Sequence, residues 1–147
     1  MKSNRRNLLV AAAAAAPAAL AATKKAPSKK SFWKDGRPKD GKTPLYSGAV
    51  TSNGFVFVSG TGKIDGGTIQ EQTKFTLDSI EAALKHAGSS MEKAVKCNVY
   101  LSDIANYAAM NEVYRGRFGE NPPARTTLAV AAIPFGCLVE IEVMAEL

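Results

Sequence analysis

From residue 46 to the C-terminus the sequence alternates two kinds of apolar spacing, and this alternation restricts the possible folds more than any other feature. Residues 69–87 place apolar side chains three and four positions apart up to Gly88, which is typical of an amphipathic helix with a glycine C-cap. Residues 139–143 instead alternate apolar and acidic side chains, as in a strand with one buried face. A chain with both periods is expected to cover a sheet with helices.

The remaining segments extend this alternation. Strand-forming residues flank an Asn-Gly turn at residues 49–58, which predicts a hairpin. Further strands are expected at 95–101 and 125–132, and between them a helix that Asp103 caps and that ends at Gly119. Apolar or aromatic side chains recur on one face of this helix, at Tyr107, Met110, Tyr114 and Phe118.

The predicted order of elements is therefore ββαβαββ, an α+β fold with a mixed sheet and two helices on one face. Two helices can cover only one face of such a sheet. The other face must meet water or another subunit, which favours an oligomer.

The positive charge of the chain lies outside this patterned segment. The formal charge is +6, from 19 basic and 13 acidic residues. Residues 1–22 contribute +3 and residues 23–43 contribute +6, which leaves −3 for residues 44–147. A mildly acidic body disfavours a nucleic-acid partner.

Residues 1–22 have the composition of a targeting segment. Arg5 and Arg6 precede an apolar, mostly alanine stretch from Leu8 to Ala22. This order predicts a cleavable export signal of the twin-arginine type, with an ordinary secretory signal or a disordered tail as the alternative. The stretch is shorter than the roughly 20 residues of a spanning helix, so no membrane contact is expected after cleavage. The mature chain is then periplasmic or secreted, or cytoplasmic if the signal is not functional.

Residues 23–43 are rich in Lys, Pro, Gly and Ser and have no apolar period. We expect a basic linker or arm that precedes one domain at residues 44–147. Phe32 and Trp33 interrupt its polar composition. They could dock on the body, which we favour, stack on a nucleic-acid base, or make no specific contact.

Several features that often mark catalytic chemistry do not support a site here. Residues 59–63 resemble a phosphate-binding loop but lack its first glycine and its final Ser or Thr. His86 is the single histidine and lies at the end of the first predicted helix, which disfavours histidine-based catalysis. Cys97 and Cys137 are interpreted as packed thiols, with one disulfide as the alternative, and no metal site is expected.

Arg125 follows Pro122-Pro123-Ala124 and begins a strand of small and apolar residues. It is either an exposed arginine at a strand end or an anion-binding group, because a guanidinium offers a rigid fork of donors that fits a carboxylate. Glu140 and Glu142 by themselves indicate only the solvated face of a half-buried strand.

Five motifs, in this order along the chain, resemble the RidA (YjgF-like) family of imine deaminases. They are Tyr46-Ser47-Gly48-Ala49-Val50, Val58-Ser59-Gly60, Asn111, Pro123-Ala124-Arg125 and Val139-Glu140-Ile141-Glu142. The resemblance implies a chorismate-mutase-like fold and a homotrimer with sites between subunits. It also implies hydrolysis, without a cofactor, of enamine and imine intermediates such as 2-aminoacrylate and 2-iminopropionate to 2-keto acids and ammonia.

The resemblance further implies roles for individual residues. Arg125 would hold the substrate carboxylate, and Glu140 would orient the attacking water. The pocket would be lined by Tyr46, Ser59, Gly60, Asn111 and Thr127, the last in a position where many members have cysteine. The size of the substrate is consistent with the role implied for Arg125, because a substrate of about six heavy atoms gains at most roughly 9 kcal/mol on binding. Charge-assisted hydrogen bonds to its carboxylate, at about 1.5 to 3 kcal/mol each, must supply much of that.

Two other functions remain open from the sequence. A non-enzymatic binder of small carboxylates would use the same arginine without the chemistry of Glu140. RNA binding or cleavage, sometimes ascribed to relatives, would draw on the basic arm and would depend steeply on salt.

Overall fold

The structure, a computed structural model, describes residues 29–33 and 36–147. The export signal predicted for residues 1–22 lies outside the described residues. Within them, no helix is both long enough and apolar enough to cross a membrane.

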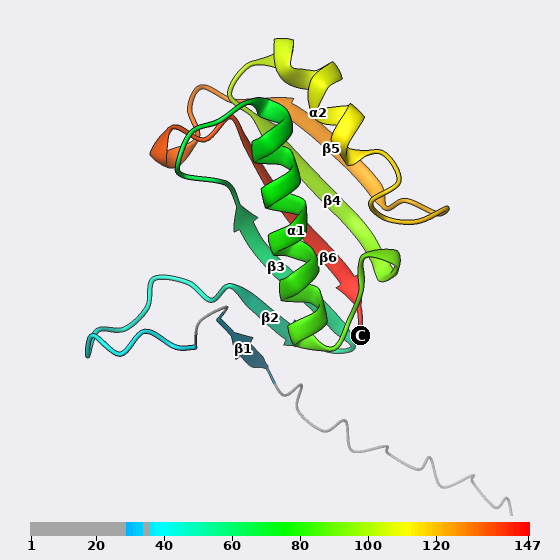
Figure 1. Ribbon diagram of the computed structural model, residues 1–147. Helices are drawn as coiled ribbons and strands as arrows, with labels where there is room; N and C mark the ends of the chain where they lie inside the picture. The colour runs from blue at the N-terminus through cyan, green and yellow to red at the C-terminus, as the bar shows by residue number, and fades with distance from the viewer. Residues whose placement is uncertain (1–28, 34–35) are drawn as a thin grey trace, which may run out of the picture.

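One mixed sheet of six strands carries both helices on the same face (Figure 1). The strand order is β1-β2-β3-β6-β4-β5, in which β4 and β5 are parallel and the other neighbours are antiparallel. From β2 onward the chain follows the predicted ββαβαββ order, so the predicted fold class is confirmed. The elements are β1 Lys30–Phe32, β2 Ala49–Ser52, β3 Phe55–Thr61, α1 Ile69–Ala87, β4 Ala94–Leu101, α2 Tyr107–Tyr114, β5 Ala124–Ala129 and β6 Val139–Glu146.

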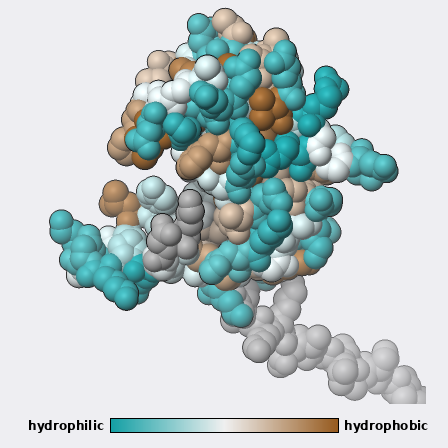
Figure 2. Space-filling model, in the orientation of Figure 1, coloured by the Kyte–Doolittle hydropathy of each residue, from teal (hydrophilic) through white to brown (hydrophobic). Residues whose placement is uncertain are grey.

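Helix α1 has the limits that its sequence predicts. The Thr68 side chain accepts a hydrogen bond from the Glu71 backbone, and the Glu71 carboxylate accepts one from the Thr68 backbone, which together form a capping box. At the other end Gly88 adopts a positive φ of 91°, which suits glycine. The apolar face of α1 packs on β3 and β6 and forms the core with them. Its outer surface is mostly hydrophilic (Figure 2).

Helix α2 is shorter than predicted. It ends at Tyr114, because Arg115 leaves the helical conformation and Gly116 takes a positive φ of 77°. Phe118 is nevertheless buried, as its apolar character requires, and its ring packs against Tyr114. The apolar period therefore continued past the true end of the helix.

The basic arm contributes a strand that the sequence pattern did not predict. Strand β1 pairs with β2, and the Phe32 side chain packs against the core. Its ring contacts the His86 ring edge-on, with the centroids 5.6 Å apart. Phe32 therefore docks on the body, as favoured above.

The sheet face opposite the helices carries exposed apolar side chains. Phe57 and Met144 face each other across β3 and β6, and Leu128 on β5 is 53% exposed. No helix among the described residues covers this face (Figure 1). Cys97 and Cys137 are both free and buried, which confirms the thiol interpretation.

Candidate functional site

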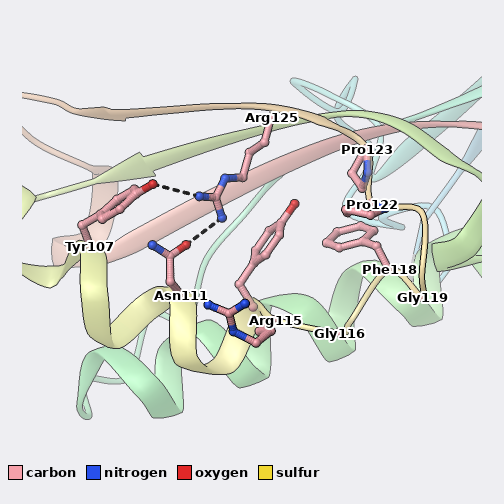
Figure 3. A pocket seen from close by; sticks show the side chains of 10 residues that line it. Tyr107, Asn111, Arg115, Gly116, Phe118, Gly119, Pro122, Pro123 and Arg125 are labelled. Carbon is pink, nitrogen blue, oxygen red and sulfur yellow. Dashed lines mark hydrogen bonds between the residues drawn. The ribbon is translucent and has the colours of Figure 1, made fainter.

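The guanidinium of Arg125 is held by side chains of α2 (Figure 3). Its Nη1 donates a hydrogen bond to Asn111 Oδ1 at 2.8 Å, and its Nη2 donates one to the Tyr107 hydroxyl at 3.2 Å. The Tyr114 ring lies 4.5 Å from the guanidinium carbon, within the range of a cation–π contact. These contacts hold the guanidinium in one position beside α2.

A cavity of about 410 Å³ opens beside this arginine. Its walls are α2, the loop that follows α2 and the start of β5 (Figure 3). No Asp or Glu is among the described residues that line it. The lining residues are Tyr107, Asn111, Tyr114, Arg115, Gly116, Phe118, Gly119, Pro122, Pro123 and Arg125.

Helical spacing explains why α2 meets Arg125 with polar groups. Tyr107 and Asn111 are four residues apart, so their side chains project from the same face of the helix. The loop after α2 turns back sharply through Gly116 and Gly119, both at positive φ. The chain then enters β5 through two prolines, which stiffens the approach to Arg125.

Burial changes the acidity of two side chains near Arg125, those of Tyr114 and Cys97. It raises the pKa of the Tyr114 phenol well above its usual range, and the neighbouring Cys97 thiol adds to this shift. Burial also raises the pKa of the Cys97 thiol. Both groups therefore stay neutral at pH 7 and place no negative charge beside Arg125.

Two further predicted residues, Gly60 on β3 and Glu140 on β6, lie next to each other. A Cβ at position 60 would overlap the Glu140 carboxylate. The register between β3 and β6 shifts between Val58 and Thr61, and this irregularity places Gly60 there. The Ser59 hydroxyl donates a hydrogen bond to the Ser47 carbonyl at 2.7 Å.

Tyr46 precedes this contact in the chain and is 71% exposed. Its carbonyl accepts a hydrogen bond of 3.4 Å from the Trp33 indole of the arm. The phenol is thus available at the surface near the Ser59 end of β3.

Within one chain, the Arg125 and Glu140 groups lie on opposite faces of the sheet. Arg125 pairs with Cys97, which is buried on the helix side. Glu140 pairs with Tyr100, three positions further along β4 and therefore on the other face. The three positions also separate the groups by about 10 Å along the strands. A single chain does not bring them together.

Thr127 lies on the helix side with Arg125, two positions further along β5. Its hydroxyl is buried and forms no hydrogen bond among the described residues. The contacts of Tyr107 and Tyr114 with Arg125 were not predicted, because both residues occupy apolar positions in the pattern of α2. The four-residue spacing of Tyr107 and Asn111 was a signal that could have identified the Tyr107 contact.

The described part of the chain contains no cluster of three or more His, Cys, Asp or Glu side chains that could hold a metal ion.

The profile of the family described as Endoribonuclease L-PSP matches residues 41–147. The chain belongs to this family, the RidA (YjgF-like) family. A mitochondrial relative, protein mmf2 of Schizosaccharomyces pombe, is 47% identical over 108 residues, which are 68% of this chain and 86% of the relative.

Two further RidA-family proteins support the assignment. The chloroplastic Reactive Intermediate Deaminase A of Arabidopsis thaliana is 36% identical over 69% of this chain and 58% of its own length. The crystal structure of RidA from the Antarctic bacterium Psychrobacter sp. PAMC 21119 superposes with a TM-score of 0.71. It is 31% identical, and the match covers 80% of this chain and 99% of that one. The predicted chorismate-mutase-like fold is thereby confirmed.

The prediction of an exported, periplasmic or secreted protein was wrong. The relatives named above include a mitochondrial and a chloroplastic protein, and no comparison supports a twin-arginine or other signal peptide. The physical reason is that a basic start without acidic residues is not specific to export signals. Organelle transit peptides share this composition.

Proposed function

We propose that the chain hydrolyses enamine and imine intermediates of the 2-aminoacrylate and 2-iminopropionate type to 2-keto acids and ammonia. Membership of a family that contains a protein named Reactive Intermediate Deaminase A supports deamination at a coarse level. The observation that carries the finer proposal is the fixed guanidinium of Arg125 beside a cavity without acidic lining residues. It is suited to hold the carboxylate of a small imino acid.

The proposed site is completed by a second copy of the chain. Arg125 and Asn111 supply one half, and Tyr46, Ser59, Gly60 and Glu140 supply the other half from a neighbouring copy. The exposed apolar face of the sheet supports association, since a face of this kind is usually covered in the assembled protein. We therefore propose the homotrimer that the family resemblance implies.

In the proposed reaction, Arg125 binds the substrate carboxylate and so fixes the imine carbon. The substrate reacts as the protonated imine: Glu140 accepts a proton from a water molecule as the water oxygen bonds to the imine carbon, and the electron pair of the carbon–nitrogen double bond moves to the nitrogen. The resulting carbinolamine carries one hydroxyl and one amino group. Glu140 returns this proton to the nitrogen, and the carbon–nitrogen bond breaks with its electron pair leaving on nitrogen. As the carbonyl forms, Glu140 accepts the hydroxyl proton and passes it to the departing ammonia, so the 2-keto acid and an ammonium ion leave. One water molecule is consumed per turnover.

The direct test supplies imines with an amino-acid oxidase and follows their decay and the release of keto acid. We expect the purified protein to accelerate this release. An unchanged rate at increasing protein concentration would refute the proposal.

The contact between Gly60 and Glu140 gives a more specific prediction. Substituting Gly60→Ala adds a Cβ where the Glu140 carboxylate lies, and this flexible side chain can swing away without unfolding the strand. We expect kcat to fall by up to about 100-fold, the cost of displacing a catalytic group by roughly 1 Å. The thermal midpoint should change little. A Gly60→Ala protein with wild-type kcat would show that Glu140 is not positioned there for catalysis.

A non-catalytic binder and an RNA-directed protein are the alternatives. The binder would bind 2-keto acids without turnover and would tolerate Glu140→Gln. The family description includes the word endoribonuclease, which belongs to the family as a whole. The net charge of −3 over residues 44–147 gives no specific support for RNA binding.

A further inference from the structure

We propose that this site accepts imino acids that carry a second, distal carboxylate, with Arg115 as the residue that recognises it. The proposal rests on the function proposed above and narrows its substrate class. Arg125 would hold the carboxylate next to the imine carbon, and Arg115 would bind the acidic end of the side chain.

The placement of Arg115 follows from the same row of α2 that holds Arg125. Tyr107, Asn111 and Arg115 are spaced four residues apart, and the backbone N–H of Arg115 still bonds to the Asn111 carbonyl at 3.0 Å. Arg115 is thus the next side chain along the row. It lines the same cavity as Arg125, so two arginines contribute to the walls of this cavity (Figure 3).

The charges of these two arginines are not compensated inside the cavity. Glu112 and Glu120 are close in the sequence but do not line it. The Arg115 side chain forms no ion pair or hydrogen bond with the described residues, whereas Arg117 nearby is paired with Asp78 and Glu81. A cavity lined by two arginines, neither of which forms an ion pair with the described residues, favours a ligand with two negative charges.

The size of the cavity agrees with a ligand larger than aminoacrylate. About 410 Å³ falls in the range of pockets that hold ligands much larger than a molecule of roughly six heavy atoms. A dicarboxylic imino acid extends the smallest substrate by a short chain and one carboxylate. That chain would cross the cavity from Arg125 toward Arg115.

Binding of stable keto-acid products tests this inference apart from turnover. Isothermal titration calorimetry would compare 2-oxoglutarate with 2-oxobutyrate on the wild-type protein and on Arg115→Ala, Arg115→Lys and Lys93→Ala. We expect Arg115→Ala to weaken 2-oxoglutarate binding about tenfold or more, the loss of one charge-assisted hydrogen bond. Binding of 2-oxobutyrate should stay within about twofold, Arg115→Lys should recover part of the loss, and Lys93→Ala, an exposed cation outside the cavity, should have no effect.

Each other outcome has a definite meaning. Equal weakening of both ligands, no weakening of either, or no binding of 2-oxoglutarate to the wild type would overturn the inference. A change in thermal midpoint alone would assign Arg115 to stabilising the C-terminal end of α2. If the calorimetric discrimination is found but no imine is hydrolysed, the function proposed above fails while the dicarboxylate site remains.

Discussion

Replacing Arg125 by alanine is expected to lower kcat/KM for imine hydrolysis by about 100- to 10,000-fold. Two charge-assisted hydrogen bonds from a guanidinium to a carboxylate are worth about 1.5 to 3 kcal/mol each, and each 1.36 kcal/mol corresponds to about tenfold in rate. An imino acid with a single carboxylate has no second charged group through which other residues could compensate for this loss. The measurement is the rate of keto-acid release from oxidase-generated imines across a range of substrate concentrations.

Two further variants distinguish the hydrogen-bonding geometry of the Arg125 guanidinium from its positive charge. Arg125→Lys keeps the charge but cannot reproduce the bonds to both Asn111 and Tyr107, so we expect an intermediate loss. Lys93→Ala removes one exposed positive charge outside the cavity and should match the wild type. Activity retained in Arg125→Ala, with the fold verified by circular dichroism, would contradict the assignment of the carboxylate to this residue.

Replacing Glu140 by glutamine is expected to lower kcat by about 100- to 10,000-fold with little change in KM. Glutamine keeps the shape of the side chain but cannot accept and return a proton, and general acid–base catalysis contributes about this much. The substrate carboxylate would still bind to Arg125, which is why KM should hold. Steady-state kinetics on one imine, together with calorimetric binding of its keto acid, would check both halves of this expectation.

Glu142 offers a matched control on the same strand and the same face. Its carboxylate accepts hydrogen bonds from the Asn98 amide at 2.8 Å and from the Tyr100 hydroxyl at 3.0 Å, and the amide oxygen of a glutamine can still accept. Glu142→Gln should therefore retain most of the activity. Equal losses in both variants would point to a general effect of charge on this face instead of proton transfer by Glu140.

Local signals in the sequence were sufficient to predict α1 and the hairpin. Thr68, Glu71 and Gly88 mark the two ends of the helix through hydrogen bonds and backbone conformation within a few residues. The hairpin turn at Asn53 and Gly54 likewise adopts the positive φ values that its sequence favours. These elements depend little on the rest of the molecule.

Elements that depend on distant partners were predicted less well. Strand β1 has no period of its own and forms because β2 offers a free edge and the core accepts Phe32. The end of α2 was placed too late because Phe118 continues the apolar spacing after Gly116 has ended the helix. Tyr107 was counted as part of an apolar face, although its hydroxyl contacts an arginine from a strand 18 residues further on.

The candidate site shows the same division. Arg125, Asn111, Gly60 and Glu140 could be selected because short motifs carry them. Periodicity did not reveal that the two groups face away from each other within one chain, since this depends on the register of β4 against both β5 and β6. Likewise, the composition of residues 1–22 did not distinguish one cellular destination from another.

The separation of Arg125 from Glu140 has a genetic consequence if each proposed site draws on two neighbouring copies. Arg125→Ala and Glu140→Gln proteins, each inactive alone, would complement each other after subunit exchange. Every trimer that contains both variants has one interface at which an intact Arg125 of one copy meets an intact Glu140 of its neighbour. A diploid cell carrying one such allele of each kind would therefore regain activity that neither homozygote has.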